Sequence, residues 1–348
     1  MSNPFSLVFG KEPKMFINTF DQFESVKNDF LDENPTTNTY LISGVRGSGK
    51  TVLLTRLQKF FESEKDWLVI DLNPEIEMIE YLTSSIYEKA NSKFKMVINE
   101  LNFSFNVVGV TISNKKPVSN IITLLEKQLD IIKQHNKKVL ICIDDVVSNA
   151  NVKAFVQQFQ ILTRKDYPVF LLMTGLYENV RSLQNSRSLT FLYRAPQIYI
   201  NKLSLIGIAE SYEKELKVSY NDAVNFAKLT NGYAFAYQVL GYILFDLDKK
   251  EINDSVLEKF DTYLREYVYE KIYYDLPKSE KEVVVAMASN TSSKTIDIIE
   301  SIDISREKMS QYRAKLIKKG LIVKSDWGKV DFALPRFREY VLKEKAFE

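Results

Sequence analysis

Apolar runs rich in β-branched residues recur along the first two hundred positions and are separated by segments with helical spacing. The five runs are TYLISG (39–44), WLVIDL (67–72), VLICID (139–144), PVFLLMT (168–174) and PQIYIN (196–201). Segments between them, such as TVLLTRLQKFFES, place apolar residues every three to four positions, which is typical of an amphipathic helix. Continuous apolar strands alternating with helices indicate a parallel sheet covered on both faces. The pattern therefore predicts a three-layer α/β domain.

One segment departs from this alternation. Residues 101–113, LNFSFNVVGVTIS, alternate between apolar and polar with period two around Gly109. Such alternation predicts a β-hairpin inserted between helices. We interpret the hairpin as an addition at the edge of the sheet in preference to a functional loop.

The strand signal ends near residue 203, and helical spacing follows. The segments LSLIGIAESYEKELK (203–217), YNDAVNFAKLT (220–230) and GYAFAYQVLGYILFDL (232–247) each carry apolar residues at that spacing. Aromatic residues at helical spacing usually belong to a core. We therefore expect a helical subdomain here.

The composition changes again from Leu276. Three segments with helical character, 277–289, 293–302 and 305–320, precede a predicted hairpin at 321–334. This order is typical of a winged helix-turn-helix. The chain therefore divides into predicted parts at residues 1–204, 205–273 and 274–348.

The segment between the first predicted strand and the first long helix carries the candidate chemistry. GVRGSGKT (44–51) fits the phosphate-binding pattern G-x-x-x-x-G-K-[ST] in the strand-to-helix setting that this pattern requires. Glycines allow backbone N–H groups to curl around phosphate oxygens, Lys50 is expected to reach the β and γ phosphates, and the Thr51 hydroxyl to bind Mg²⁺. ATP and Mg²⁺ are the expected cofactors. The predicted nucleotide-binding residues are Gly44, Arg46, Gly47, Ser48, Gly49, Lys50, Thr51 and Val52.

A second acidic element supports this interpretation. In VLICIDDV an apolar strand ends in Asp144 and Asp145. Asp144 is the predicted second Mg²⁺ residue beside Thr51, and Asp145 stands where many ATPases place a glutamate that polarises the attacking water. Because aspartate is one methylene shorter, we expect slow hydrolysis, which keeps a nucleotide-gated switch open as an alternative. The paired aspartates can also be read as a cap for the next helix.

Two further polar candidates follow the next strands. Thr174 ends the strand FLLMT, where it can sense the γ phosphate or simply begin a turn. Arg181, Arg187 and Arg194 come after it, and any of them can act as an arginine finger or lie on the surface. Thr174 and Arg194 complete the predicted catalytic set of Lys50, Asp144 and Asp145.

In this order, the motifs resemble those of a known group. GVRGSGKT, ICIDDV, the hairpin before the acidic strand, MTGL, LTFLYRAPQIYINKLS, TNGYAFAYQVLG and SQYRAKLIKKGLI together make the chain similar to AAA+/STAND-type P-loop ATPases related to prokaryotic origin-recognition initiators. The resemblance covers nearly the whole chain. It implies an ATPase core, a helical lid and a C-terminal winged helix. It also implies a homo-oligomer in which an arginine from a neighbouring subunit completes the site.

The chain departs from the pattern of this group at three places. The segment NGYAFAYQ lacks the arginine of a sensor-2 motif and has Ala234 where STAND proteins often carry proline, which argues against direct sensing of nucleotide by the lid. KEPKMFINTF lacks the usual Gly-Arg pair, so Pro13, Phe16 and Ile17 are the candidates for base contacts. The third departure is Asp145 in place of glutamate. We therefore expect the chain to bind ATP, and these departures bear on how fast it hydrolyses ATP.

The third helix of the predicted winged helix is basic. Ser305 is its expected cap, and Met309, Leu316 and Ile317 are expected to face inward. The predicted DNA contacts are Arg306, Lys308, Gln311, Arg313, Lys315 and, on the hairpin, Lys329. Such residues can reach base edges and phosphates of duplex DNA, and counterion release then supplies affinity at low salt. Docking of a protein remains the alternative, because nearby acidic residues dilute the positive charge.

Composition adds few constraints. The 348 residues are 45% apolar and 26% charged, which is typical of a globular protein, and a net charge of +2 identifies no partner. The single cysteine, Cys142, lies in an apolar run and is expected to be a reduced core residue, while His135 is expected in a solvated loop. No apolar run approaches the ~20 residues that span a bilayer. We expect a cytoplasmic protein without a membrane partner.

Two hypotheses for the function follow. The first is an ATPase that binds ATP or ADP and whose nucleotide state controls a DNA-bound assembly. The second is a slowly hydrolysing STAND-type nucleotide switch that uses the winged helix to bind protein. A P-loop kinase of a small substrate is disfavoured by the helical and winged appendages.

Overall fold

The computed structural model describes residues 2–8, 10, 17, 20–89, 106–107, 110–111, 121–290, 292 and 294–347. The chain forms two compact units. We call the first the sheet unit, which comprises Phe20–Ser43 and Thr51–Tyr199. The second, the helical unit, comprises Met1–Thr19, Gly44–Lys50 and Ile200–Glu348. The three-part division at residues 204 and 273 stays a prediction.

The sheet unit is built on five parallel strands. They run in the order β2-β5-β6-β1-β7, and each end lies within two residues of its predicted position. Every residue of β1 and of β6 is buried, as expected for strands covered on both faces. The strands are β1 (Thr39–Ser43), β2 (Trp67–Asp71), β5 (Lys138–Ile143), β6 (Val169–Gly175) and β7 (Gln197–Tyr199).

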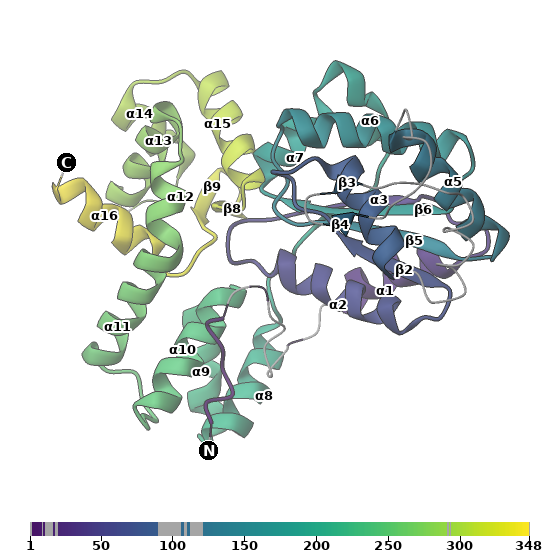
Figure 1. Ribbon diagram of the computed structural model, residues 1–348. Helices are drawn as coiled ribbons and strands as arrows, with labels where there is room; N and C mark the ends of the chain where they lie inside the picture. Colours follow the sequence, from purple (N-terminus) through teal and green to yellow (C-terminus); the bar gives the residue numbers. More distant parts are fainter. Residues whose placement is uncertain are drawn as a thin grey trace. The chain divides into compact units, whose positions relative to one another are not determined.

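Helices cover both faces of this sheet, which confirms the three-layer prediction. Figure 1 shows α1 and α2 on one side and α3, α5 and α6 on the other. The first side is aromatic: the rings of Phe61 and Trp67 lie 4.4 Å apart, and those of Phe30 and Phe170 lie 4.9 Å apart. The helices are α1 (Phe20–Leu31), α2 (Lys50–Ser63), α3 (Met78–Lys89), α5 (Ile121–Gln134), α6 (Ala150–Arg164) and α7 (Tyr177–Gln184), followed by the 3₁₀ segment η1 (Arg187–Tyr193).

Two predictions for single residues are confirmed in this unit. Cys142 is a free cysteine with no exposed surface, in the middle of the sheet. His135 is exposed in the turn after α5. Neither residue has the setting of a catalytic group. Among the described residues, no helix is both long and apolar enough to cross a membrane.

The interpretation of the inserted hairpin as an edge addition is wrong. β3 (Asn106–Val107) and β4 (Val110–Thr111) are antiparallel and form a two-stranded sheet of their own. Among the described residues of this segment, the strand pairing is between Asn106 and Thr111 and between Val107 and Val110. The other residues of the segment 101–113 lie outside the described part of the chain.

The first half of the helical unit contains the three predicted helices. These are α8 (Leu205–Leu216), α9 (Tyr220–Thr230) and α10 (Ala234–Asp246), and they are followed by α11 (Asp254–Leu264), a π-helical turn η2 (Arg265–Tyr269) and α12 (Glu270–Tyr274). Phe5 is buried here against Tyr212 and Tyr237, with ring centroids 5.7 Å away in both cases. A Cβ on Gly241 would collide with the Phe5 ring, so this glycine makes room for the N-terminal segment. No local pattern in the sequence indicates that contact.

The C-terminal part has the order of elements predicted for a winged helix. Helices α13 (Lys278–Ser289), α14 (Thr295–Ile302) and α15 (Arg306–Lys318) precede the antiparallel strands β8 (Ile322–Asp326) and β9 (Lys329–Phe332), and α16 (Phe337–Phe347) follows. The last helix was not predicted. Its buried residues Phe337, Tyr340 and Val341 do have helical spacing, so the signal was present in the sequence.

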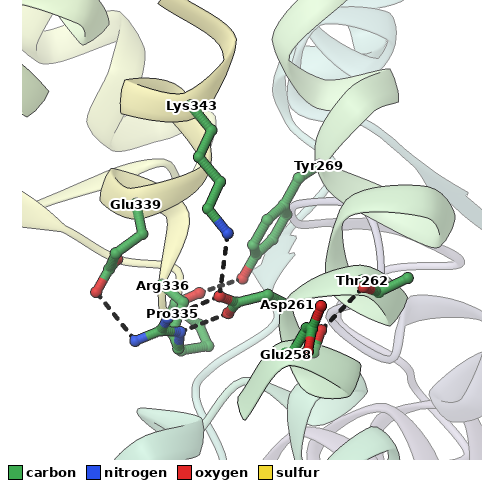
Figure 2. Close-up of polar contacts among 8 residues, drawn as sticks. All are labelled: Glu258, Asp261, Thr262, Tyr269, Pro335, Arg336, Glu339 and Lys343. Carbon is green, nitrogen blue, oxygen red and sulfur yellow. Dashed lines mark hydrogen bonds and ion pairs between the residues drawn. The ribbon is translucent and has the colours of Figure 1, made fainter. Parts of the chain in front are cut away.

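An ion pair joins α11 to the start of α16 within the helical unit (Figure 2). The Arg336 guanidinium donates to both carboxylate oxygens of Asp261, from Nε at 2.5 Å and from Nη2 at 2.7 Å. Arg336 has a left-handed backbone with φ of +58°. The hydroxyl of Tyr269 donates to the carbonyl of Pro335 at 2.5 Å. The hydrogen bond to Asp261 raises the pKa of Arg336. The two charge-assisted bonds attach the start of α16 to α11 at two points.

Candidate functional site

The loop of residues 44–50 connects β1 to α2 and has a backbone that requires glycine. Gly47 and Gly49 adopt φ of +74° and +102°, a region that side chains disfavour. A Cβ on Gly44 would lie 2.6 Å from Ser48 Oγ. The Ser48 N–H donates to the Val45 carbonyl at 3.2 Å and tightens the curl. The three glycines of the motif therefore each have a steric reason to be there.

Two polar side chains of this loop are buried. Lys50 is 9% exposed, and its Nζ donates to the Val45 carbonyl at 3.1 Å. Ser48 Oγ is buried and has no hydrogen-bond partner among the described residues. A buried hydroxyl without a partner costs about 1–3 kcal/mol. An anionic ligand with oxygen acceptors would satisfy it.

In the sheet unit, three of the predicted site residues form one hydrogen-bonded group. The Thr51 hydroxyl donates to one carboxylate oxygen of Asp144 at 2.9 Å, and the Thr174 hydroxyl donates to the other. We call this group the carboxylate cluster. It consists of Thr51, Asp144 and Thr174, from three different elements. The hydroxyls hold the carboxylate in one orientation.

Strand order explains why Thr174 takes part. β6 lies between β1 and β5, with Thr174 paired to Ile42 and Met173 paired to Ile143. The carboxyl end of β6 is therefore adjacent to Asp144, which directly follows β5. The alternative of a turn-initiating threonine does not account for its bond to a carboxylate.

Asp145 faces a different environment from Asp144. It is exposed, and its backbone is left-handed with φ of +50°. Its N–H donates to Thr174 Oγ1 at 3.1 Å, so its backbone is tied to the carboxylate cluster. The alternative of helix capping is wrong, because α6 is capped by Asn149, whose side chain accepts the Val152 N–H at 2.9 Å.

The arginine candidates lie on the surface of the sheet unit. Arg181, Arg187 and Arg194 are all exposed. The Arg181 guanidinium lies 5.3 Å from the centre of the Tyr193 ring, and Arg194 follows the end of η1. Within the described residues, no hydrogen bond or ion pair joins Arg194 to the carboxylate cluster.

The candidates for base contacts are only partly described. Pro13 and Phe16 lie outside the described residues. Ile17 is half-buried and packs near Gly207, where an added Cβ would lie 3.1 Å from Ile17 Cγ2.

The basic helix α15 has the predicted orientation. Ser305 Oγ accepts the Lys308 N–H at 3.2 Å, which confirms the cap. Met309 and Leu316 are fully buried as predicted, whereas Ile317 is half-buried and packs against the edge of the core. The DNA-contact candidates are all accessible to solvent: Arg306, Lys308, Gln311 and Lys315 are exposed, and Arg313 and Lys329 are half-buried. Lys329 Nζ lies 3.4 Å from Asp326, which offsets part of the charge of the hairpin.

Two hydrogen bonds to the loop of residues 44–50 were not predicted. The Tyr233 hydroxyl donates to the Arg46 carbonyl at 2.5 Å, and the Phe235 N–H donates to the Gly47 carbonyl at 3.2 Å. Both partners belong to the helical unit. The available signal was a tyrosine just before a helix that lacks a capping side chain.

Several solved structures have a fold similar to that of this chain. The chain is similar to the Walker-type ATPase PABY2304 of Pyrococcus abyssi, with 15% identity, a TM-score of 0.62 and coverage of 94% of this chain and 96% of the other. It is also similar to the Aeropyrum pernix ORC2 protein in its ADPNP-ADP complexes, with 10% identity, a TM-score of 0.58 and coverage of 98% of each chain. A third similar structure is Cdc6p of Pyrobaculum aerophilum, with 14% identity, a TM-score of 0.50 and coverage of 97% of each chain.

The chain has an origin-recognition-type AAA+ fold. At these identities the likeness concerns the fold, and it confirms the resemblance drawn from the motifs. A family model described as "Domain of unknown function (DUF8462)" matches residues 266–341. No curated protein matches the chain. These comparisons therefore show the fold of the chain.

Proposed function

We propose that this protein binds and hydrolyses Mg·ATP and that its nucleotide state controls an assembly on DNA. The observation that carries the proposal is the carboxylate cluster, in which Thr51 of the phosphate-binding motif donates to Asp144 at 2.9 Å. A threonine and a carboxylate, one on each of the two motifs, are the Mg²⁺ residues of P-loop ATPases. Two of the similar structures, a Walker-type ATPase and a protein in ADPNP-ADP complexes, support the same activity.

The residues present fit both cofactors. The left-handed glycines suit a phosphate group, as does the Ser48 hydroxyl, which has no partner in the described part of the chain. Lys50 supplies a compact cation. Mg²⁺ at nucleotides is usually held by one or two protein ligands together with phosphate oxygens and water, so Thr51 and Asp144 are sufficient. When bound, the ion neutralises charge that develops on the transferred phosphoryl group. Thr174 keeps the Asp144 carboxylate oriented, and a fixed orientation of a metal ligand strengthens binding.

Asp145 is the proposed group that polarises the attacking water. Its exposed carboxylate is accessible to water, and the bond from its N–H to Thr174 fixes its backbone next to Asp144. The short side chain and the exposed position both favour slow turnover in the isolated chain. We propose that Arg194 of a neighbouring copy completes the site and raises the rate in a homo-oligomer.

We expect Asp145→Asn to lower the rate of ATP hydrolysis by about 100-fold, because a positioned base contributes about 10²–10⁴-fold. The affinity for ATP should stay within about twofold of wild type, since the amide keeps the shape of the side chain. Phosphate release under single-turnover conditions, with and without duplex DNA, measures the rate. The matched control is Asp166→Asn, an exposed aspartate of the same unit with φ of +56°. Equal rates for Asp145→Asn and wild type would remove Asp145 from the chemical step.

The proposed partner of the C-terminal part, residues 274–348, is duplex DNA. The exposed side of α15 carries Arg306, Lys308 and Lys315, while its buried side anchors the helix. A helix with this distribution can lie in a major groove with its cations on phosphates. The alternative is a slowly hydrolysing switch whose winged helix binds protein, and the pairing of Lys329 with Asp326 favours it.

A salt titration separates these two functions. We expect binding to random-sequence duplex DNA to weaken steeply as salt rises, because each phosphate contact adds about 0.9 to the slope of log affinity against log salt. The double variant Arg306→Ala/Lys315→Ala should lower that slope by about two. Lys249→Ala/Lys250→Ala, which removes the same charge from an exposed loop, is the control and should leave the slope unchanged. Salt-independent binding, or no binding at low salt, would favour the protein partner.

A further inference from the structure

The amino-terminal end of α10 lies against the phosphate-binding loop within the helical unit. Tyr233, the residue before the helix, is 4% exposed and places its hydroxyl 2.5 Å from the Arg46 carbonyl oxygen. Two residues later, the Phe235 N–H donates to the Gly47 carbonyl at 3.2 Å. Two successive carbonyls of the loop are therefore bound by one helix end.

The contact satisfies both partners. The first N–H groups of a helix have no partner inside the helix and are usually satisfied by a capping side chain. Tyr233 makes no such cap, and the Gly47 carbonyl takes that role for the Phe235 N–H. In return, α10 provides donors for the Arg46 and Gly47 carbonyls. The end of the helix and the curl of the loop therefore stabilise each other.

The direction of these carbonyls matters for an anion site. A peptide unit is planar, and its C=O and N–H point in opposite directions. Because the Arg46 carbonyl is held on the Tyr233 hydroxyl, the Gly47 N–H points away from α10. Loops that bind phosphate present N–H groups to the anion and turn carbonyls outward. A free Arg46 carbonyl could instead rotate toward the phosphates and repel them.

The glycine at position 47 fits this contact closely. A Cβ there would collide with the Tyr233 hydroxyl oxygen and lie 3.0 Å from Phe235 Cβ. Burial raises the pKa of Tyr233, and the charge of Arg46 opposes this shift more weakly, so the hydroxyl remains a donor. The motif glycine is thus needed for the approach of α10 as well as for its own backbone angle.

We propose that Tyr233 is a positioning residue of the nucleotide site, whose hydroxyl holds the Arg46–Gly47 peptide in the orientation that binds phosphate. The inference rests on the proposed ATP binding and adds a residue to it. It also gives the lid a route to the nucleotide that does not use a sensor-2 arginine, which this chain lacks. The lid acts on the loop backbone and not on the phosphates.

The variant Tyr233→Phe tests the proposal, because it removes the hydroxyl and keeps the ring. We expect the affinity for Mg·ATP and for ADP, measured by isothermal titration, to fall about fivefold, the typical effect of one lost hydrogen bond. Hydrogen exchange of the nucleotide-free protein should become faster at residues 44–50 and at the start of α10.

The control is Tyr237→Phe on the same helix. Tyr237 is 1% exposed, and its hydroxyl lies 2.6 Å from Ser211 Oγ, so this variant also loses one buried hydrogen bond. We expect both variants to lose the same thermal stability. Tyr237→Phe should keep the nucleotide affinity of the wild-type protein, whereas Tyr233→Phe should not. Equal affinities in all three proteins, or an equal loss in both variants, would overturn the inference. Failure of the wild-type protein to bind nucleotide would instead overturn the proposed function.

Discussion

Replacing Lys50 with alanine is expected to lower the affinity for Mg·ATP by about 100-fold or more, because charge-assisted bonds to two phosphate oxygens are each worth about 1.5–3 kcal/mol. Lys50 begins α2 and is 9% exposed, with its Nζ already inside the curl of the loop at 3.1 Å from the Val45 carbonyl. Equilibrium binding of fluorescent ATP to the full chain measures the effect.

The matched control for that variant is Lys59→Ala, an exposed lysine near the other end of α2. It removes the same charge from the same helix and should leave the affinity unchanged. Thermal unfolding without nucleotide should show that both variants are folded. Unchanged ATP binding by folded Lys50→Ala protein would mean that the loop is not the phosphate site.

The second large effect concerns the ion pair in Figure 2. We expect Asp261→Asn to lower the free energy of unfolding by about 2 kcal/mol, less than the 3–5 kcal/mol typical of fully buried pairs, since the side chains of Arg336 and Asp261 are 24% and 19% exposed. The loss arises because Arg336 keeps its charge and lacks its two-point acceptor. Urea denaturation followed by circular dichroism measures it.

An exposed pair of the same unit provides the comparison. Glu266 lies 3.1 Å from Arg265, with side chains 53% and 46% exposed. Glu266→Gln should cost less than about 0.5 kcal/mol, as exposed pairs usually do. If the two variants lost equal stability, the Arg336–Asp261 pair would be no more than a surface interaction.

Local patterns predicted most of the fold. Runs such as VLICI are apolar throughout because β5 is buried on both faces, and this signal needs no knowledge of neighbours. The spacing of apolar residues likewise located α8, α9 and α10. The phosphate-binding loop was found because its glycines and Lys50 follow each other directly in the chain.

The order of the strands was beyond such reasoning. The placement of β6 between β1 and β5 depends on packing across the whole sheet, and it is what brings Thr174 to Asp144. From the sequence alone, Thr174 could equally begin a turn. The predicted position of the inserted hairpin was wrong for a related reason. Periodicity indicates that a segment forms strands, but it does not indicate which strands pair with each other.

Contacts between distant residues were also missed. Tyr233 and Arg46 are separated by 187 positions, and no periodic pattern links a tyrosine before one helix to a carbonyl before another. The pair of Arg336 and Asp261 likewise requires a left-handed arginine after Pro335, which composition does not indicate. The residues that tune the site are thus harder to predict than those that define it.

The most direct measurement of the central claim is a crystal structure of the wild-type protein with a non-hydrolysable ATP analogue and Mg²⁺. We predict phosphate density within the loop of residues 44–50 and a magnesium ion beside Thr51 and Asp144. A nucleotide bound elsewhere, or an Asp144 carboxylate turned away from the ion, would contradict the account.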